Sequence, residues 1–264
     1  MPERLFPYAR LALASRSIIV TGAASGIGAE VARLLAARGA RLLLADRDSA
    51  RLAATVRALA EAGGEAEGFV VDIVRPGEVE AMVDAAVQHF GRLDGACNAA
   101  GILPPMAPIE AIAPDRWART IDILLAGTLT CIERQAEAMS EAGGTIVSIA
   151  SAVAVVPIPG LSDYVAAKAA LFGATRAIAS AYARRNVRAN LVVPGTIRTP
   201  MTAGLLEATP AIREAVLAGI PLGRLGDPAD VAEAVAWLLS DAARYVTGAE
   251  ITVDGGQILE DICA

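Results

Sequence analysis

Histidine and cysteine are scarce in this chain, and their scarcity removes several kinds of functional site. His89 is the only histidine in 264 residues, so neither a histidine-based metal centre nor a Ser-His-Asp triad is expected. The three cysteines, Cys97, Cys131 and Cys263, lie far apart and form no CxxC pair. This spacing indicates reduced thiols and not a disulfide framework or a zinc site. We therefore predict that the protein binds no metal and is cytoplasmic.

Basic clusters and long apolar runs are also missing. The formal net charge is -6, and the one adjacent basic pair, Arg184 and Arg185, is typical of a solvated helix end. Nucleic acid is therefore not an expected partner. No apolar stretch reaches the roughly 18 residues that a membrane-spanning helix requires. Residues 1–14 contain Pro2, Pro7 and Arg10 and lack the apolar core of a signal peptide, so we interpret them as a short N-terminal extension, with no membrane partner.

Lysine is almost absent as well, and the place of the single lysine is informative. Lys168 follows Tyr164 by four residues, whereas every other basic residue among the 23 is an arginine. With four tyrosines in 264 residues, a lysine placed at random would have this spacing in 4 of 264 cases, so chance is a poor explanation. An ammonium beside a phenol favours the phenolate, which would make Tyr164 an acid and base usable near neutral pH.

Short β-branched or leucine-rich runs alternate with longer alanine-rich stretches along the chain. Such alternation predicts βαβ units, and nearly continuous apolar strands suit a parallel sheet that is covered on both faces. We predict a doubly wound α/β fold with a mainly parallel seven-stranded sheet, as a single catalytic domain over 15–264. The predicted strands are 17–21, 41–45, 68–72, 93–98, 145–149, 187–193 and 250–253. The predicted helices are 26–38, 48–62, 76–90, 114–141, 161–185 and 228–240.

A segment rich in proline and glycine, about 195–221, interrupts this alternation. We predict a loop there with one or two short helices. Its position late in the sheet makes it a candidate substrate lid.

A glycine-rich turn joins the first predicted strand to an amphipathic helix. Gly22, Gly26 and Gly28 give the spacing G-x-x-x-G-x-G. Glycines at this point let the backbone approach a pyrophosphate, and a helix N-terminus offers free N–H donors and a positive dipole. A tight strand-to-helix turn without a ligand is the alternative interpretation.

Acidic and small residues at the ends of the next predicted strands also indicate a site for a dinucleotide. Asp46 stands at the end of the second predicted strand, where a carboxylate can accept from both ribose hydroxyls and repels a 2′-phosphate. NAD is therefore favoured over NADP, although Arg47 offers a charge that can reach a 2′-phosphate. Asp72 is placed to accept from an adenine amino group, with capping of the next turn as the alternative. The small residues of Asn98-Ala99-Ala100-Gly101 would let the chain pass close to a ribose.

These motifs together resemble the short-chain dehydrogenase/reductase family, in its single-domain branch, whose chains have about this length and a Rossmann-type fold. The resemblance runs from about residue 15 to 257. It is carried by T21-GAASGIG-28, Asp72, N98-AAG-101, Ser151, Y164-VAAK-168, P194-GTIRT-199 and D254-GG-256.

The resemblance implies a role for each matching residue. Tyr164 would be the general acid and base toward the substrate oxygen, while hydride moves to or from the nicotinamide. Lys168 would lower the pKa of Tyr164 and hold the nicotinamide ribose, and Ser151 would hydrogen-bond the substrate oxygen. Thr199 and the Ile197 backbone would hold the carboxamide. The full set of expected cofactor contacts is Gly22, Ser25, Gly26, Ile27, Gly28, Asp46, Asp72, Ile73, Asn98, Ala99, Gly101, Tyr164, Lys168, Pro194, Ile197 and Thr199.

One position departs from the family pattern W-x-x-x-x-D-x-N. Counting from Trp117, Leu124 stands where the family has an asparagine that helps to retain a water beside the lysine. Leucine cannot hydrogen-bond a water. Asp122 is a poor substitute because it lies two residues away, on another helix face. We expect hydride transfer to persist, with protons following another path or exchanging more slowly.

Residues expected around the substrate are largely apolar. They are Ile102, Leu103, Met106, Val153 to Pro159, Met201, Leu205 and Leu206. This lining favours a secondary alcohol or ketone on a hydrophobic, alicyclic or aromatic skeleton. A non-catalytic dinucleotide sensor or interaction protein is the alternative that Leu124 supports, and a sugar-nucleotide epimerase or dehydratase is a further one. The family analogy also suggests a homotetramer.

Overall fold

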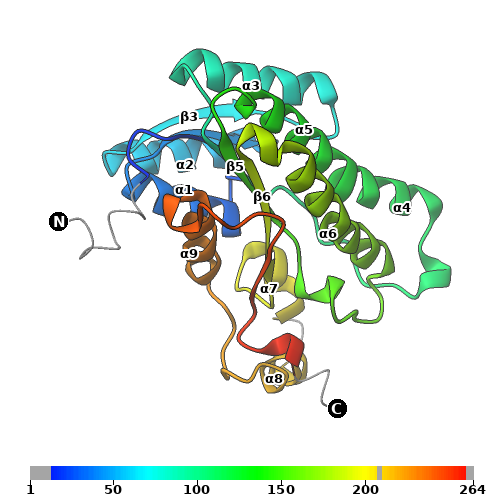
Figure 1. Cartoon of the computed structure of the whole chain (residues 1–264). Coiled ribbons are helices and arrows are strands. Elements are labelled where there is room, and N and C mark those ends of the chain that lie inside the picture. The colour runs from blue at the N-terminus through cyan, green and yellow to red at the C-terminus, as the bar shows by residue number, and fades with distance from the viewer. Residues whose placement is uncertain (1–12, 207–209, 260–264) are drawn as a thin grey trace.

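Seven parallel strands form one sheet in the order β3-β2-β1-β4-β5-β6-β7 (Figure 1). The computed structural model describes residues 13–206 and 210–259, so most of the expected N-terminal extension, and Cys263, lie outside the described residues. The strands are β1 (Ser17–Thr21), β2 (Arg41–Asp46), β3 (Glu65–Val70), β4 (Gly95–Asn98), β5 (Gly144–Ile149), β6 (Val187–Pro194) and β7 (Glu250–Val253). The predicted doubly wound parallel sheet is confirmed.

Helices cover both faces of this sheet (Figure 1). Around residues such as Val31, Leu35 and Val235, α1, α2 and α9 form one core with the sheet. On the other face, α3 and α5 pack around Met82 and Ile132, and α6 packs beside them along β6. The helices are α1 (Gly26–Ala37), α2 (Ser49–Glu61), α3 (Pro76–Phe90), α4 (Pro114–Ile121), α5 (Thr128–Met139), α6 (Ser162–Tyr182), α7 (Pro200–Leu206), α8 (Pro210–Ala218) and α9 (Pro228–Leu239).

The third strand lies earlier than the sequence predicts. The apolar pattern places it at 68–72, but β3 pairs with β2 from Arg41↔Glu65 to Asp46↔Val70. As an edge strand it has no fully buried residue and carries two glutamates, so its own apolar pattern is weak, and the apolar partner strand sets its bounds. Asp72 consequently follows the strand by two residues instead of closing it. The fourth strand is likewise shorter than expected, because it begins at Gly95 and not at residue 93.

The stretch 114–141, predicted as one helix, is divided into three parts. A π-helical segment, Asp122–Gly127, separates α4 from α5. Apolar periodicity alone does not reveal such a segment, since it adds only a local change of hydrogen-bond register. A Cβ on Gly127 would lie 2.9 Å from the Ile73 carbonyl oxygen, so a side chain at this position is excluded by the loop that follows β3.

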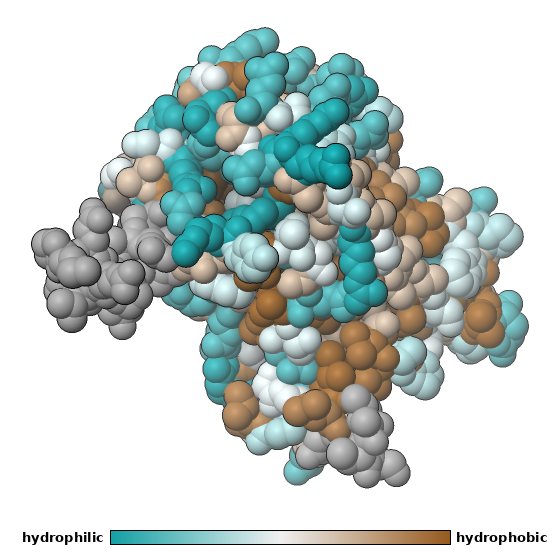
Figure 2. All heavy atoms as spheres, viewed as in Figure 1, coloured by the Kyte–Doolittle hydropathy of each residue, from teal (hydrophilic) through white to brown (hydrophobic). Residues whose placement is uncertain are grey.

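The proline- and glycine-rich segment contains two short helices, α7 and α8, as predicted. They lie beyond the carboxyl end of β6, at the lower part of the molecule in Figure 1. Figure 2 shows apolar side chains gathered in this region, whereas the surface around α3 is mostly hydrophilic. Leu222, in the turn after α8, is 70% exposed.

Two of the three cysteines lie in the described structure, and both are buried. Cys97 and Cys131 are free thiols, and burial raises the pKa of each to about 12, which keeps them protonated. Among residues 13–206 and 210–259, no helix is both long and apolar enough to cross a membrane.

Candidate active site

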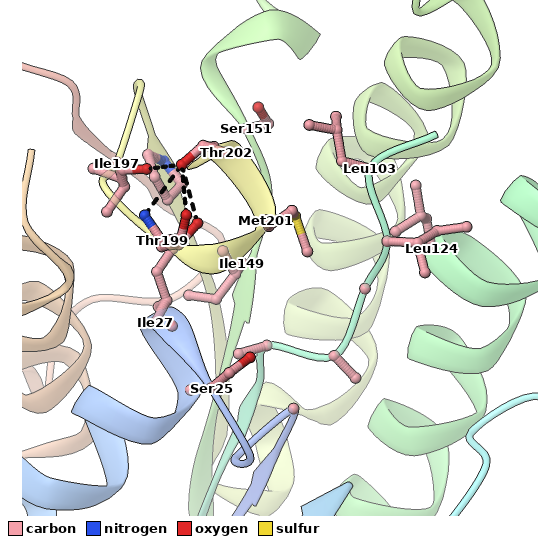
Figure 3. A pocket seen from close by; sticks show the side chains of 18 of the residues that line it. Ser25, Ile27, Leu103, Leu124, Ile149, Ser151, Ile197, Thr199, Met201 and Thr202 are labelled. Atoms are coloured by element: carbon pink, nitrogen blue, oxygen red, sulfur yellow. Dashed lines mark hydrogen bonds between the residues drawn. The ribbon is translucent and has the colours of Figure 1, made fainter. Parts of the chain in front are cut away.

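A cavity of about 400 Å³ opens at the carboxyl ends of β1, β4, β5 and β6. The strand order reverses direction between β1 and β4, and such a switch point is where doubly wound sheets bind ligands. Figure 3 shows Ser25 and Ile27 on one side of the cavity and Leu103, Leu124 and Met201 on the other. The cavity thus joins the glycine turn to an apolar compartment.

The glycine turn forms a close-packed cradle at the start of α1. Gly22 has φ +71°, and a Cβ there would lie 2.7 Å from the Ala100 backbone nitrogen. A Cβ on Gly28 would collide with the Gly22 carbonyl oxygen. No side chain caps the N-terminus of α1, because Ser25 makes no capping hydrogen bond. Free backbone donors and a close backbone approach fit the pyrophosphate of a dinucleotide.

Asp46 and Asp72, the two predicted acidic contacts of the cofactor, both line the cavity. One carboxylate oxygen of Asp46 accepts from the Ala24 backbone nitrogen at 3.1 Å, and the other accepts from the Asp48 backbone nitrogen at 3.0 Å. These bonds fix the carboxylate and leave each oxygen able to accept once more. Asp72 Oδ1 accepts from the Val74 backbone nitrogen at 3.3 Å, so it also caps its own turn.

Asn98 differs from the other expected cofactor contacts. Its side chain exchanges two hydrogen bonds with Gln135 of α5, at 2.9 and 3.0 Å, and it is not part of the cavity lining. The amide therefore ties β4 to α5 beneath the cavity. The other expected residues, both catalytic and cofactor-binding, do line the cavity.

Ser151, Tyr164 and Lys168 converge from two elements. Ser151 follows β5 by two residues, while Tyr164 and Lys168 lie one turn apart on the buried face of α6. Lys168 Nζ donates to the Ile149 carbonyl oxygen at 2.7 Å and lies 5.9 Å from the centre of the Tyr164 ring. All three side chains face one cavity, which is the arrangement that acid–base chemistry on a bound hydroxyl requires.

The pKa of Tyr164 does not follow the sequence-based expectation. Burial raises the pKa of the phenol, and hydrogen bonding with Ser151 offsets only part of this effect. Burial also lowers the pKa of Lys168 to about 8, so its charge is a weaker support for the phenolate than an exposed ammonium would be. Desolvation of the phenol thus outweighs the hydrogen bond with Ser151, so the pKa of Tyr164 lies above its usual value and not below it.

Leu124 fills the space beside these residues. Its side chain is fully buried and packs in one apolar cluster with Leu161, Tyr164 and Ala167. A Cβ on Gly101 would lie 3.1 Å from Leu124 Cδ2, so the loop after β4 presses on the same side chain. The position that the family gives to an asparagine is therefore part of an apolar wall.

A buried ion pair holds the first turn of α6. Arg116 of α4 donates two hydrogen bonds to the Asp163 carboxylate, at 2.9 and 3.1 Å, and Thr120 Oγ1 donates a third at 2.9 Å. Burial by itself would raise the pKa of Asp163, but these bonds and the Tyr164 backbone N–H hold it below its usual value. The pair fixes the residue directly before Tyr164.

Several functional positions were missed by the sequence analysis. Thr202 Oγ1 accepts from the Thr199 backbone nitrogen at 3.1 Å and donates to the Ile197 carbonyl oxygen at 2.6 Å (Figure 3). Gln257 Oε1 accepts from the Thr196 backbone nitrogen at 2.9 Å. These side chains shape the loop 194–199. A hydroxyl three residues after Thr199 is a signal for the first contact, whereas no local signal indicates the second.

Within the described ranges, 13–206 and 210–259, no group of three or more His, Cys, Asp or Glu side chains has a metal-binding arrangement. The apolar compartment contains Ile102, Leu103, Val153 and Met201, as expected. Met106 is half-exposed and absent from the lining, and the side chain of Leu205 lies outside what the structure describes.

Comparison with known proteins identifies the family. Residues 22–257 match the family described as Enoyl-(Acyl carrier protein) reductase. The chain is 44% identical to cis-4-hydroxycyclohexanecarboxylate dehydrogenase of Sinomonas cyclohexanicum, over 93% of this chain and 97% of the relative. It is 39% identical to 2,5-dichloro-2,5-cyclohexadiene-1,4-diol dehydrogenase of Sphingobium indicum, over 92% of this chain and 97% of that one.

Solved structures with a closely similar fold are also known. A short-chain dehydrogenase/reductase of Mycobacterium ulcerans superimposes with a TM-score of 0.91 at 34% identity, covering 94% of this chain and 91% of the other. The chain belongs to the short-chain dehydrogenase/reductase family. The relatives named above are dehydrogenases of hydroxyl-bearing small molecules, so the class of protein is a hydroxyl oxidoreductase, in a family that uses nicotinamide cofactors.

Proposed function

We propose that the protein is an NAD-dependent oxidoreductase that interconverts a secondary alcohol and a ketone on a hydrophobic, alicyclic molecule. The observation that carries this proposal is the convergence of Ser151, Tyr164 and Lys168 on a cavity that begins at an uncapped, glycine-lined helix N-terminus. A glycine cradle without an acid–base group would bind a dinucleotide but could not exchange a proton with a substrate. An acid–base group without the cradle would have no bound hydride carrier.

The residues present fit a dinucleotide. Gly22 and residues 25–28 would hold the pyrophosphate, because side chains are excluded there and backbone donors are free. Asp46 would accept from the adenosine ribose, which favours NAD, and Asp72 and Ile73 would border the adenine. Thr199 and Ile197, braced by Thr202, would hold the carboxamide end.

The chemical step requires few groups from the chain. When bound, an oxidised nicotinamide supplies the hydride acceptor and a positive charge. Tyr164 then takes the proton from the substrate hydroxyl during oxidation and returns it during reduction. Ser151 donates to the substrate oxygen as negative charge develops on it, and Lys168, held by the Ile149 carbonyl, orients the ribose and supports the phenolate.

The shape and chemistry of the apolar compartment support a ring-bearing substrate. Leu103, Leu124 and Met201 offer no charge to anchor a phosphate or carboxylate (Figure 3). The two relatives compared above carry cyclohexane or cyclohexadiene alcohols in their names. A hydroxylated six-membered ring is therefore the substrate class that we infer.

Leu124 gives this proposal a specific consequence for proton exchange. Because its side chain is apolar and buried, the proton of Tyr164 and Lys168 reaches solvent by a route other than a water held at position 124. A Leu124→Asn variant is expected to alter the pH profile of turnover. An unchanged profile would show that this position does not limit proton transfer.

A non-catalytic dinucleotide sensor remains the second candidate, because Leu124 removes one element of the family machinery. Family analogy also suggests a homotetramer, and the cysteine usage suggests a cytoplasmic protein.

The function is tested by following NADH absorbance with NAD⁺ and a panel of cyclohexanols, using NADP⁺ in parallel. Turnover of a cyclic alcohol with NAD⁺ supports the enzyme. Binding of NADH without turnover of any panel member supports the sensor.

A further inference from the structure

A second cavity, of about 380 Å³, lies at the amino end of the sheet, where the strands begin. Its walls come from the segments that enter β1, β4, β5 and β6 and from the turn after α9. From Arg188 to Pro194, which lines the first cavity, β6 spans about 20 Å. The two cavities are therefore separate sites on the same strands.

Four arginines and two aspartates line this second cavity. The arginines are Arg16, Arg92, Arg188 and Arg244, and the aspartates are Asp94 and Asp241. The charges of the lining therefore sum to +2, in a protein whose net charge is -6. A positive concavity on an acidic protein is a local feature that bulk composition does not produce.

Each aspartate is already paired. Asp94 contacts Arg92 and accepts from the Ser17 backbone nitrogen at 2.9 Å, and Asp241 contacts Arg16. The carboxylates therefore neutralise two of the four guanidinium groups and hold them in place. The remaining two positive charges belong to Arg188 and Arg244.

Arg188 and Arg244 supply the unneutralised charge in different ways. Arg188 is half-buried and donates to the backbone carbonyls of Val246, Leu238 and Ser240, which fix its position without cancelling its charge. Burial lowers the pKa of Arg188 and the nearby charge of Arg16 lowers it further, while the Asp241 carboxylate, shared with Arg16, raises it in part. Arg244 is exposed at the rim, and within the described residues no hydrogen bond or ion pair of its side chain is found.

We propose that this second cavity is a binding site for a small, multiply charged oxyanion, such as a polyphosphate or a polycarboxylate. A guanidinium offers five N–H donors in a planar fork that matches phosphate and carboxylate oxygens. The paired and carbonyl-bound arginines commit only part of these donors, and Arg244 closes on the anion from the rim. Binding would relieve the repulsion between Arg16 and Arg188.

The proposal is tested by calorimetric titration of the full-length protein with sodium pyrophosphate and, separately, with citrate, at constant ionic strength. Saturable binding of either anion is expected, and the tighter of the two identifies the preferred oxyanion. Arg244→Ala should weaken it at least fivefold and Arg244→Glu more strongly. Because Arg244 is exposed and, within the described residues, its side chain makes no hydrogen bond or ion pair, both variants should retain the melting temperature of the wild type.

Arg57→Ala is the matched control. Arg57 is exposed on α2, outside the second cavity, and its removal changes the net charge by the same amount. Equal weakening by Arg57→Ala and Arg244→Ala would indicate a general charge effect and overturn the proposal. Binding that is unaffected by Arg244→Ala would place the anion elsewhere, including the glycine cradle, and would also overturn it, as would the absence of saturable binding.

Discussion

The two ends of the parallel sheet hold ionisable groups under opposite conditions. At the carboxyl end, Tyr164 and Lys168 are buried beside apolar side chains, and burial shifts the pKa of each away from its usual value. At the amino end, pairs such as Arg16 and Asp241 remain in contact with water. Desolvation sets the direction of the pKa shift of Tyr164 and Lys168, whereas hydrogen bonds outweigh it at Asp163. Each cavity is lined by six charged residues, so the number of charges does not distinguish the end that we propose for proton transfer.

The largest effect is expected from Tyr164→Phe, which removes the proposed proton donor and acceptor at the carboxyl end. Turnover should fall by about 10²- to 10⁴-fold, the usual contribution of general acid–base catalysis. NADH binding, followed by fluorescence, should persist. Tyr245→Phe is the control, since Tyr245 is fully exposed and away from the cavity. A Tyr164→Phe enzyme within tenfold of the wild type would refute the assigned role.

Lys168→Met tests the cost of burying charge at the same end. The folded pKa of about 8 lies below the usual value of 10.5, so below pH 8 the folded protein bears the full cost of the buried ammonium. The variant should be more stable than the wild type by about 3 kcal/mol at pH 7, on the scale of 1.36 kcal/mol per pKa unit. The difference should shrink as the pH rises from 8 towards 10.5. Urea unfolding at several pH values measures it, and a difference that grows with pH would contradict this account.

Arg116→Ala sharpens the comparison by breaking a buried ion pair. The Asp163 carboxylate would keep Thr120 but lose two hydrogen bonds, which should cost about 2 to 3 kcal/mol, below the full range because Arg116 is partly exposed. Since the pKa of Asp163 is lowered in the folded state, this stability is present above the unfolded pKa, near 4, and is lost as the pH falls further. Arg119→Ala, exposed on the same helix, is the control in thermal unfolding. Equal melting temperatures for the two variants would mean that the pair contributes nothing.

The smallest effect is expected at the amino end. Asp241→Asn removes the partner of Arg16, but both side chains are partly exposed, so stability should fall by less than about 1 kcal/mol. In 1 M salt the difference should vanish, because screening there acts over about 3 Å. A loss as large as that of Arg116→Ala, persisting in salt, would show that the amino end is as desolvated as the carboxyl end.

Local sequence patterns predicted correctly the elements whose bounds are marked by their own residues. The bounds of β1, α3 and β7 match the predictions, because apolar runs and a proline at the first helical turn mark them directly. The interruption at Asp122–Gly127 was not predictable from periodicity. Gly127, at the end of this segment, lies against Ile73 in the loop after β3, a close approach that local sequence does not reveal.

The sequence predicted only part of the candidate site, because some of its contacts join segments that are far apart in the chain. Motif spacing identified Ser151, Tyr164 and Lys168, since a turn of helix and a strand end suffice to bring them together. It did not show that Asn98 pairs with Gln135 of a distant helix, nor that burial raises the pKa of Tyr164. The arginines of the second cavity come from four separate segments, and only the folded sheet makes them neighbours.

The single lysine makes this protein convenient for chemical labelling. Apart from the N-terminal amine, Lys168 is the one primary amine in the 264 residues, and it is only 6% exposed. An amine-reactive reagent can reach it only through the cavity at the carboxyl end of the sheet. The extent of labelling, counted by intact mass, therefore reports how much of that cavity is filled by any compound added to the solution. The side chain that we propose to serve the reaction thus gives a direct measure of occupancy.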